Sequence, residues 1–138
     1  MATMTAAERR AESKAKYNAF LAVCPSQKLL DRISNKWVTL ILTALGSGPD
    51  YTGEPEAMRY SELARTLAGV SPKMLTQTLR SLEADGLVSR TVTPTVPVTV
   101  SYELTEIGLS LQQTIRGLKL WAEVHMDEIL ANRATSTV

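Results

Sequence analysis

The amino-acid sequence predicts an α+β fold in which helices surround a single β-hairpin. Apolar residues recur every three or four positions over residues 71–86 and 111–129, which is the spacing of amphipathic helices. Over residues 87–104 the spacing falls to about two, and the segment Pro94–Pro97 interrupts it as a turn. The 138 residues suffice for one domain with a core and are too few for two comfortable domains.

The composition excludes several classes of protein. Hydrophobic residues make up 44% of the chain and charged residues 21%, values typical of a globular protein rather than a disordered one. No apolar run approaches the roughly 20 residues that span a bilayer, and the first 20 residues lack the apolar core of a signal peptide. We therefore expect a cytoplasmic protein without a membrane partner. Cys24 is the only cysteine, which excludes an internal disulfide.

Charge is unevenly distributed along the chain, although the net charge is only +1. Residues 1–40 hold seven basic and three acidic side chains, whereas residues 101–138 hold three basic and five acidic ones. A basic N-terminal part and an acidic C-terminal part are consistent with a protein that presents one side to DNA. An N-terminal helix that is simply basic and solvated explains the same pattern equally well.

The first half of the chain predicts three helices of unequal amphipathicity. Residues 1–22 form a basic arm or helix whose start we expect to be irregular. Pro25 can open a second helix, in which we expect the apolar side chains to face inward. The third helix, residues 36–45, is expected to be the central buried one and to end at Gly46. The inward-facing side chains expected in these helices are Leu29, Leu30, Ile33, Trp37, Leu40, Ile41, Ala44 and Leu45.

Residues 47–57 have the composition of a loop, with glycine, proline and acidic residues but without the spacing of a calcium-binding loop. We therefore expect no metal site there. The segment Met58–Tyr60 can form a very short strand. Ser61 is then placed to cap a helix that runs to Gly69.

The segment from Ser71 to Gly86 predicts one complete short helix with two different faces. Ser71 can cap it, Pro72 suits its first position, and Gly86 can end it in a left-handed conformation. Leucines 75, 79 and 82 make an apolar stripe, and a second face combines Lys73, Thr76, Gln77 and Arg80. Such side chains bond phosphates and base edges in a major groove. An ordinary amphipathic surface helix is the alternative interpretation.

The order of helix, tight turn, helix and hairpin predicts a winged helix-turn-helix domain over residues 23–104, with residues 71–86 as the DNA recognition helix and the hairpin as the wing. Arg90 lies at the base of the expected wing, where it can contact the DNA backbone. If the exposed face of the recognition helix instead meets a protein, the domain is an interaction module that does not bind DNA.

Residues 105–138 predict a long C-terminal helix and tail that mediate dimerisation. Thr105 can cap this helix, and its apolar stripe is longer than one small domain can cover, which favours packing against a second copy. His125 lies on the stripe and is the only histidine, so no metal site or catalytic triad can form around it. The predicted dimer residues are Leu111, Ile115, Leu118, Trp121, Ala122, His125 and Ile129.

No enzymatic activity and no cofactor are expected, because the sequence contains no paired nucleophile and base, no glycine-rich phosphate loop and no cluster of metal ligands. Cys24 precedes the helix that Pro25 opens, and a helix N-terminus favours a thiolate. A buried, inert thiol is the alternative interpretation of this residue.

Several short motifs also occur together between Cys24 and His125. They are a Cys-Pro pair, a Lys-Trp helix start, the pattern Ser-x-Lys-x-Leu-Thr-x-x-Leu-Arg and a Leu-Thr-x-x-Gly after the hairpin. In this combination the chain resembles the HxlR-type, MarR-like winged-helix transcriptional regulators of bacteria. The resemblance implies a homodimer that represses or activates transcription from a palindromic operator in double-stranded DNA.

The resemblance also implies roles for individual residues. It places Lys73, Thr76, Gln77 and Arg80 at the major groove, and the Pro94–Thr99 tip at the wing. It places Cys24 where some members carry a thiol that senses an oxidant or a small electrophilic inducer. The chain departs from the family pattern in its longer 47–57 loop, in Ser34-Asn35 where a glycine pair is typical, and in Thr99 where a basic residue is common.

Overall fold

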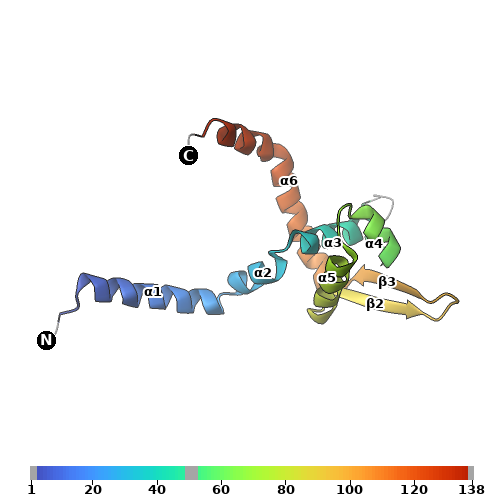
Figure 1. Ribbon diagram of the computed structural model, residues 1–138, viewed down its shortest axis with the longest axis horizontal. Coiled ribbons are helices and arrows are strands. Elements are labelled where there is room, and N and C mark those ends of the chain that lie inside the picture. Colours follow the sequence, from blue (N-terminus) through green and yellow to red (C-terminus); the bar gives the residue numbers. More distant parts are fainter. Residues whose placement is uncertain (1–2, 49–52, 137–138) are drawn as a thin grey trace. The chain divides into compact units, whose positions relative to one another are not determined.

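The computed structural model describes residues 3–48 and 53–136 and divides into two compact units, residues 1–35 and 36–138. The first unit contains helices α1 (Ala6–Val23) and α2 (Pro25–Ile33). The second contains α3 (Lys36–Ser47), β1 (Met58–Arg59), α4 (Tyr60–Thr66), α5 (Pro72–Ala84), β2 (Val88–Thr93), β3 (Thr99–Leu104) and α6 (Glu106–Ala134). Figure 1 shows these elements, and the predicted α+β winged helix-turn-helix fold is confirmed.

Helix α1 begins closer to the N-terminus than the sequence pattern indicated. The Glu8 backbone N–H donates to Thr5 Oγ1 (3.1 Å), and the Thr5 backbone N–H donates to the Glu8 carboxylate (2.7 Å). This reciprocal capping box satisfies two backbone donors that would otherwise lack partners. The expectation of an irregular start is therefore wrong from residue 6 onward.

Helix α2 begins at Pro25, as predicted, but it buries none of its side chains. The expectation that Leu29 and Leu30 face inward is wrong, because both are exposed. Periodicity identifies an apolar face, but it does not identify what covers that face.

Helix α3 is the central buried helix, as predicted, and its Ile41, Leu42 and Leu45 side chains have no exposed surface. Its apolar face is rotated from the expected one, since Leu40 is exposed and Val38 is buried. The helix continues through Gly46 to Ser47, so the predicted stop at Gly46 is wrong. Gly48, with a φ of +78°, follows its last residue instead.

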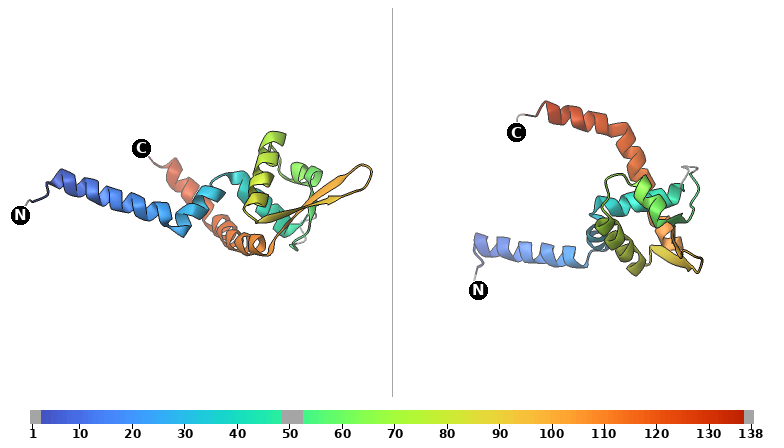
Figure 2. Two further views of the ribbon diagram at one scale, coloured as in Figure 1. Left: turned by 90° about the horizontal axis from the view of Figure 1, so that it is seen from below. Right: turned by 45° about the vertical axis from the view of Figure 1, so that its right-hand side comes forward.

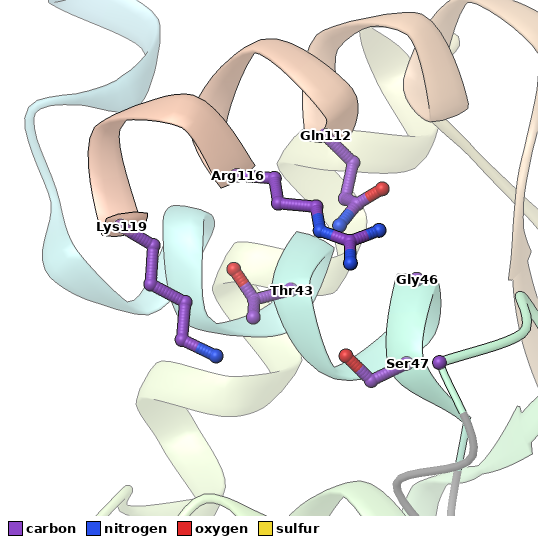
Figure 3. A pocket seen from close by; sticks show the side chains of 7 residues that line it. Thr43, Gly46, Ser47, Gln112, Arg116 and Lys119 are labelled. Carbon is purple, nitrogen blue, oxygen red and sulfur yellow. The ribbon is translucent and has the colours of Figure 1, made fainter. Parts of the chain in front are cut away.

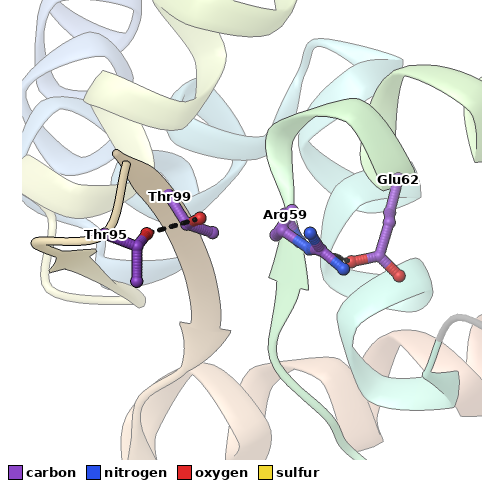
Figure 4. A network of polar contacts seen from close by, with 4 residues as sticks. All are labelled: Arg59, Glu62, Thr95 and Thr99. Carbon is purple, nitrogen blue, oxygen red and sulfur yellow. Dashed lines mark hydrogen bonds and ion pairs between the residues drawn. The ribbon is translucent and has the colours of Figure 1, made fainter. Parts of the chain in front are cut away.

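The strand β1 has only two residues, and α4 begins directly after it at Tyr60. Its N-cap is Arg59, whose backbone N–H donates to the Glu62 carboxylate (3.1 Å) and whose side chain forms an ion pair with it (3.4 Å; Figure 4). The predicted cap at Ser61 is therefore wrong, and the helix ends at Thr66 rather than at Gly69.

The sheet has three antiparallel strands in the order β1-β3-β2. In the hairpin, Val88 pairs with Leu104 and Thr93 with Thr99, so residues 94–98 form the tip. Val88 is buried at the base, whereas residues 90–98 are all exposed. Figure 2 shows the hairpin extending beyond the helices of the second unit, which is the arrangement of a wing.

Helix α6 is held at its start and uncovered toward its end. Thr105 Oγ1 accepts the Gly108 backbone N–H (3.1 Å) and donates to the Gly86 carbonyl (2.6 Å), so the predicted cap is confirmed. The buried residues of α6 are Gly108, Gln112 and Ile115, all in its first half. Beyond them the helix leaves the core (Figure 1).

Candidate nucleic-acid interface

Helix α5 has the two ends that the sequence predicted. The Ser71 side chain accepts a hydrogen bond from the Met74 backbone N–H (3.1 Å), and Pro72 is the first helical residue. Gly86 follows the helix with a φ of +75°, a left-handed conformation that glycine adopts without strain. These local signals fix the length and the orientation of the helix.

The two faces of α5 also separate as predicted. Leu75, Leu79 and Leu82 are buried in the core, and they are joined by Thr78, whose hydroxyl donates to the Met74 carbonyl (2.7 Å). The opposite face carries the exposed side chains of Lys73, Gln77 and Arg80. This face therefore presents two cations and one amide to solvent, and none of these three side chains is part of the core.

Tyr60 supports α5 and was not anticipated from the sequence, where it was assigned to a strand. Its hydroxyl lies 3.2 Å from the Pro72 carbonyl, to which it donates, and 3.4 Å from Thr76 Oγ1. The first residue of α4 is thereby joined to the first turn of α5. Thr76 is half-buried by the same contact, so it offers less surface than Gln77 or Arg80.

A hollow of about 290 Å³ lies where α5 faces the hairpin. It is lined by Thr76, Arg80 and Glu83 of α5 and by Arg90 and Tyr102 of the two strands. Within the described part of the chain, neither arginine makes an ion pair. The structure therefore brings Arg80 of the recognition helix and Arg90 of the wing to one surface, with two positive charges against the single carboxylate of Glu83.

The tip of the wing is uncharged. Thr99 is half-buried, and its hydroxyl lies 3.2 Å from that of Thr95 (Figure 4). The Thr95 hydroxyl donates to the Pro97 carbonyl (2.8 Å). The tip therefore offers only hydroxyl and backbone groups for polar contacts, and Arg90 is the cation of the wing.

The predicted dimer residues fall into two groups along α6. Ile115 is only 8% exposed and belongs to the core of its own protomer, and Leu111 is half-buried. Leu118, Trp121 and Ile129 are exposed. His125 stacks on Trp121 with 4.4 Å between ring centroids, and its Nδ1 lies 2.9 Å from the Trp121 carbonyl. An uncovered apolar surface thus begins at residue 118, and Ala122 and His125 lie half-buried along it.

Cys24 is the N-cap residue of α2 and is half-buried, so the fully buried alternative does not hold. The backbone N–H groups of the first turn of α2 lower the pKa of the thiol, that of Gln27 first and then that of Ser26, while burial opposes them. Their geometry falls short of a capping hydrogen bond to the sulfur. A lowered pKa increases the fraction of thiolate, the reactive form, at neutral pH.

Over the described residues, no group of three or more histidine, cysteine or acidic side chains is arranged to hold a metal ion. Over the same residues, no helix is long and apolar enough to cross a membrane.

The short helix α4 is joined by the Tyr60 hydroxyl to the capped helix α5, and a two-stranded wing follows. This arrangement defines a winged helix-turn-helix protein. The family model of the HxlR-like helix-turn-helix matches residues 32–130. The chain is 39% identical over 116 residues to the HTH-type transcriptional regulator YtfH of Escherichia coli (strain K12), covering 84% of this chain and 86% of YtfH.

Two solved structures agree with this match. A YtfH transcriptional regulator from Salmonella typhimurium has a TM-score of 0.68 and 37% identity, over 82% of this chain and 94% of that one. The redox regulator HypR in its reduced form has a TM-score of 0.69 and 33% identity, over 78% of this chain and 99% of that one. The chain belongs to the HxlR-like helix-turn-helix family and is a DNA-binding transcriptional regulator.

Proposed function

We propose that this regulator acts as a homodimer that recognises a two-fold symmetric operator through α5 and holds the flanking backbone with its wing. The observation that carries the proposal is the single surface on which Arg80 and Arg90 stand without ion-pair partners among the described residues. Two such surfaces related by a dimer axis would meet successive major grooves, roughly 34 Å apart. The operator is then an inverted repeat.

The exposure of each side chain supports a division of roles on α5. Gln77 and Arg80 are exposed and long enough to reach base edges, glutamine favouring adenine and arginine favouring guanine. Lys73 in the first turn serves phosphate or guanine, and the backbone at Ser71 and Pro72 lies beside phosphate. The remaining contacts are Thr76 with a thymine methyl, and Arg90 and Thr99 with the DNA backbone.

Substitution of a base-reading side chain should therefore flatten sequence preference. Arg80→Ala or Gln77→Ala is expected to weaken binding to the operator by about 1–3 kcal/mol and to leave binding to scrambled duplex nearly unchanged. Fluorescence anisotropy on operator and scrambled duplex measures both quantities. Unchanged operator affinity in both variants would mean that this face of α5 does not read DNA.

Arg90→Ala provides the matched control on the wing. It should weaken binding to both duplexes equally and reduce the slope of log affinity against log salt by about one unit, since one fewer phosphate is neutralised. Selective loss on the operator alone would instead assign Arg90 to a base.

We also propose that Cys24 makes DNA binding sensitive to oxidants. Its lowered thiol pKa supports this proposal, as does the similarity to a protein described as a redox regulator. Thiolate is oxidised by peroxide to sulfenic acid, and partial exposure gives the oxidant access.

Peroxide or hypochlorite is therefore expected to weaken operator binding by the wild type and to leave Cys24→Ser unaffected. Because the thiolate is the reactive form, the rate of oxidation should fall as the pH drops through the lowered pKa of the thiol. Anisotropy before and after oxidation, followed by reduction with a thiol, measures the effect. An equal loss of binding in Cys24→Ser would assign the response to another residue.

A further inference from the structure

A second polar hollow lies inside the second unit, between α3 and the first half of α6. Its volume is about 240 Å³. Figure 3 shows Gln112, Arg116 and Lys119 projecting from α6 toward Thr43 and Ser47 of α3. No residue of α5 or of the hairpin lines this hollow, so the DNA-binding surface does not account for it.

Gln112 is the most informative side chain of the hollow. It is only 7% exposed, and its amide makes no hydrogen bond with any described residue. In the part of the chain that the structure describes, no side-chain nitrogen or oxygen is both sealed from solvent and without a partner. Gln112 is one of the residues that line the hollow, so its amide can form hydrogen bonds with a polar occupant.

The backbone is adapted to this placement of Gln112. A Cβ atom at Gly46 of α3 would lie 2.7 Å from Gln112 Nε2, so any larger residue at position 46 would push the amide away. Glycine within a helix is otherwise unfavourable by about 1 kcal/mol relative to alanine. Glycine at position 46 therefore lowers the stability of the helix but leaves room for the Gln112 amide beside the hollow.

The charges of the hollow select an anion. Positions 112, 116 and 119 follow helical spacing, which places amide, guanidinium and ammonium on one face of α6. Arg116 makes no ion pair in the described part of the chain, and the partner of Lys119 is Glu123, 3.9 Å away and outside the hollow. Among the residues that the structure describes, none with a carboxylate lines the hollow.

The α3 side of the hollow favours a weakly charged anion that carries hydroxyl groups. Ser47 is the last residue of α3, and the C-terminal end of a helix bears partial negative charge, which disfavours a doubly charged phosphate. The Thr43 hydroxyl donates to the Thr39 carbonyl (2.8 Å), so its lone pairs remain free to accept a hydrogen bond from a ligand hydroxyl.

We propose that this hollow binds a small hydroxycarboxylic acid. Arg116 would hold the carboxylate through two parallel hydrogen bonds, with Lys119 as a second cation. Gln112 and Thr43 would bond the hydroxyl groups. At roughly 30 Å³ for each water molecule, the hollow holds about eight waters, which limits the ligand to a small molecule.

Titration calorimetry of the full chain with glycerate tests the proposal and requires no DNA, so its outcome is separate from that of the proposed operator recognition. The wild type is expected to bind glycerate, to bind inorganic phosphate more weakly and not to bind glycerol. Arg116→Gln and Gln112→Leu should each weaken glycerate binding at least about tenfold, or roughly 1.4 kcal/mol. Arg133→Gln, at the far end of α6, is the matched control and should bind as the wild type does.

Arg116 is exposed, so its replacement leaves the core intact even if Gln112→Leu proves unstable. Three results would overturn the proposal. They are the absence of glycerate binding up to about 10 mM, tighter binding of phosphate than of glycerate, and equal glycerate affinities in Arg116→Gln and Arg133→Gln.

Discussion

Gly108→Ala is expected to destabilise the fold by about 3 kcal/mol. A Cβ atom at this position would overlap the carbonyl oxygen of Leu87 and lie 2.9 Å from its carbonyl carbon. The obstacle is backbone, not the end of a flexible side chain. The Leu87 carbonyl accepts the Thr105 N–H (3.1 Å), and the Leu87 N–H donates to the Leu82 carbonyl (3.0 Å), so neither side can move without breaking hydrogen bonds. Overpacking of this kind costs about 1–3 kcal/mol and occasionally more.

Gly117→Ala in the same helix is the matched control. No atom lies within 4 Å of a Cβ built there, so only the helix propensity changes, and we expect a gain of roughly 0.5–1 kcal/mol. Urea unfolding of both variants measures the two shifts. Equal midpoints for the two alanine variants would show that the contact of α6 with Leu87 yields easily.

The difference between Gly108 and Gly117 also shows which structural features can be predicted from the sequence. The Leu-Thr-x-x-Gly motif was recognisable as a pattern, but its reason is a close approach between segments that are distant in the chain. The ends of α5 were predicted correctly because Ser71, Pro72 and Gly86 act on their immediate neighbours. Local chemistry can be predicted from local sequence.

The errors have two causes, which are helix caps that the residue types did not suggest and contacts between distant segments. Helix α4 begins at Tyr60 because Arg59 and Glu62 form its cap, although Ser61 is the residue type that usually does so. The bond from Tyr60 to the first turn of α5 and the placement of Gln112 beside Gly46 leave no periodic signal. The apolar face of α2 was identified, but no part of the first unit that the structure describes buries it.

For α6, the periodicity predicted the apolar stripe, but it did not predict the residue beyond which the stripe no longer packs against the core of its own protomer. Ile115 and Leu118 are equivalent in the pattern, yet the first is 8% exposed and the second 64%. The position of this boundary depends on how far α3 and the base of the hairpin extend along α6. Residues before it pack within the protomer, and residues after it are available to a partner.

This boundary makes Leu118→Asp a selective test of the proposed dimer. Because Leu118 is already exposed in the protomer, aspartate there should leave the fold of the single chain intact. In a two-fold dimer the carboxylate would be buried twice against apolar side chains, each time at a penalty of several kcal/mol, which exceeds what an ordinary interface can absorb. We expect a folded monomer by light scattering, with operator affinity lost together with the second recognition helix.

Ile107→Asp is the matched control for this substitution. Ile107 is 60% exposed on the first turn of the same helix, on the side of the stripe but about three turns before Leu118. A carboxylate there is also stabilised by the helix N-terminus. This variant should remain dimeric and bind the operator as the wild type does. A stable dimer in Leu118→Asp would place the interface elsewhere, whereas dissociation of Ile107→Asp would move it toward the start of α6. Only the loss of the dimer in the first variant and its retention in the second assigns association to the uncovered half of the helix.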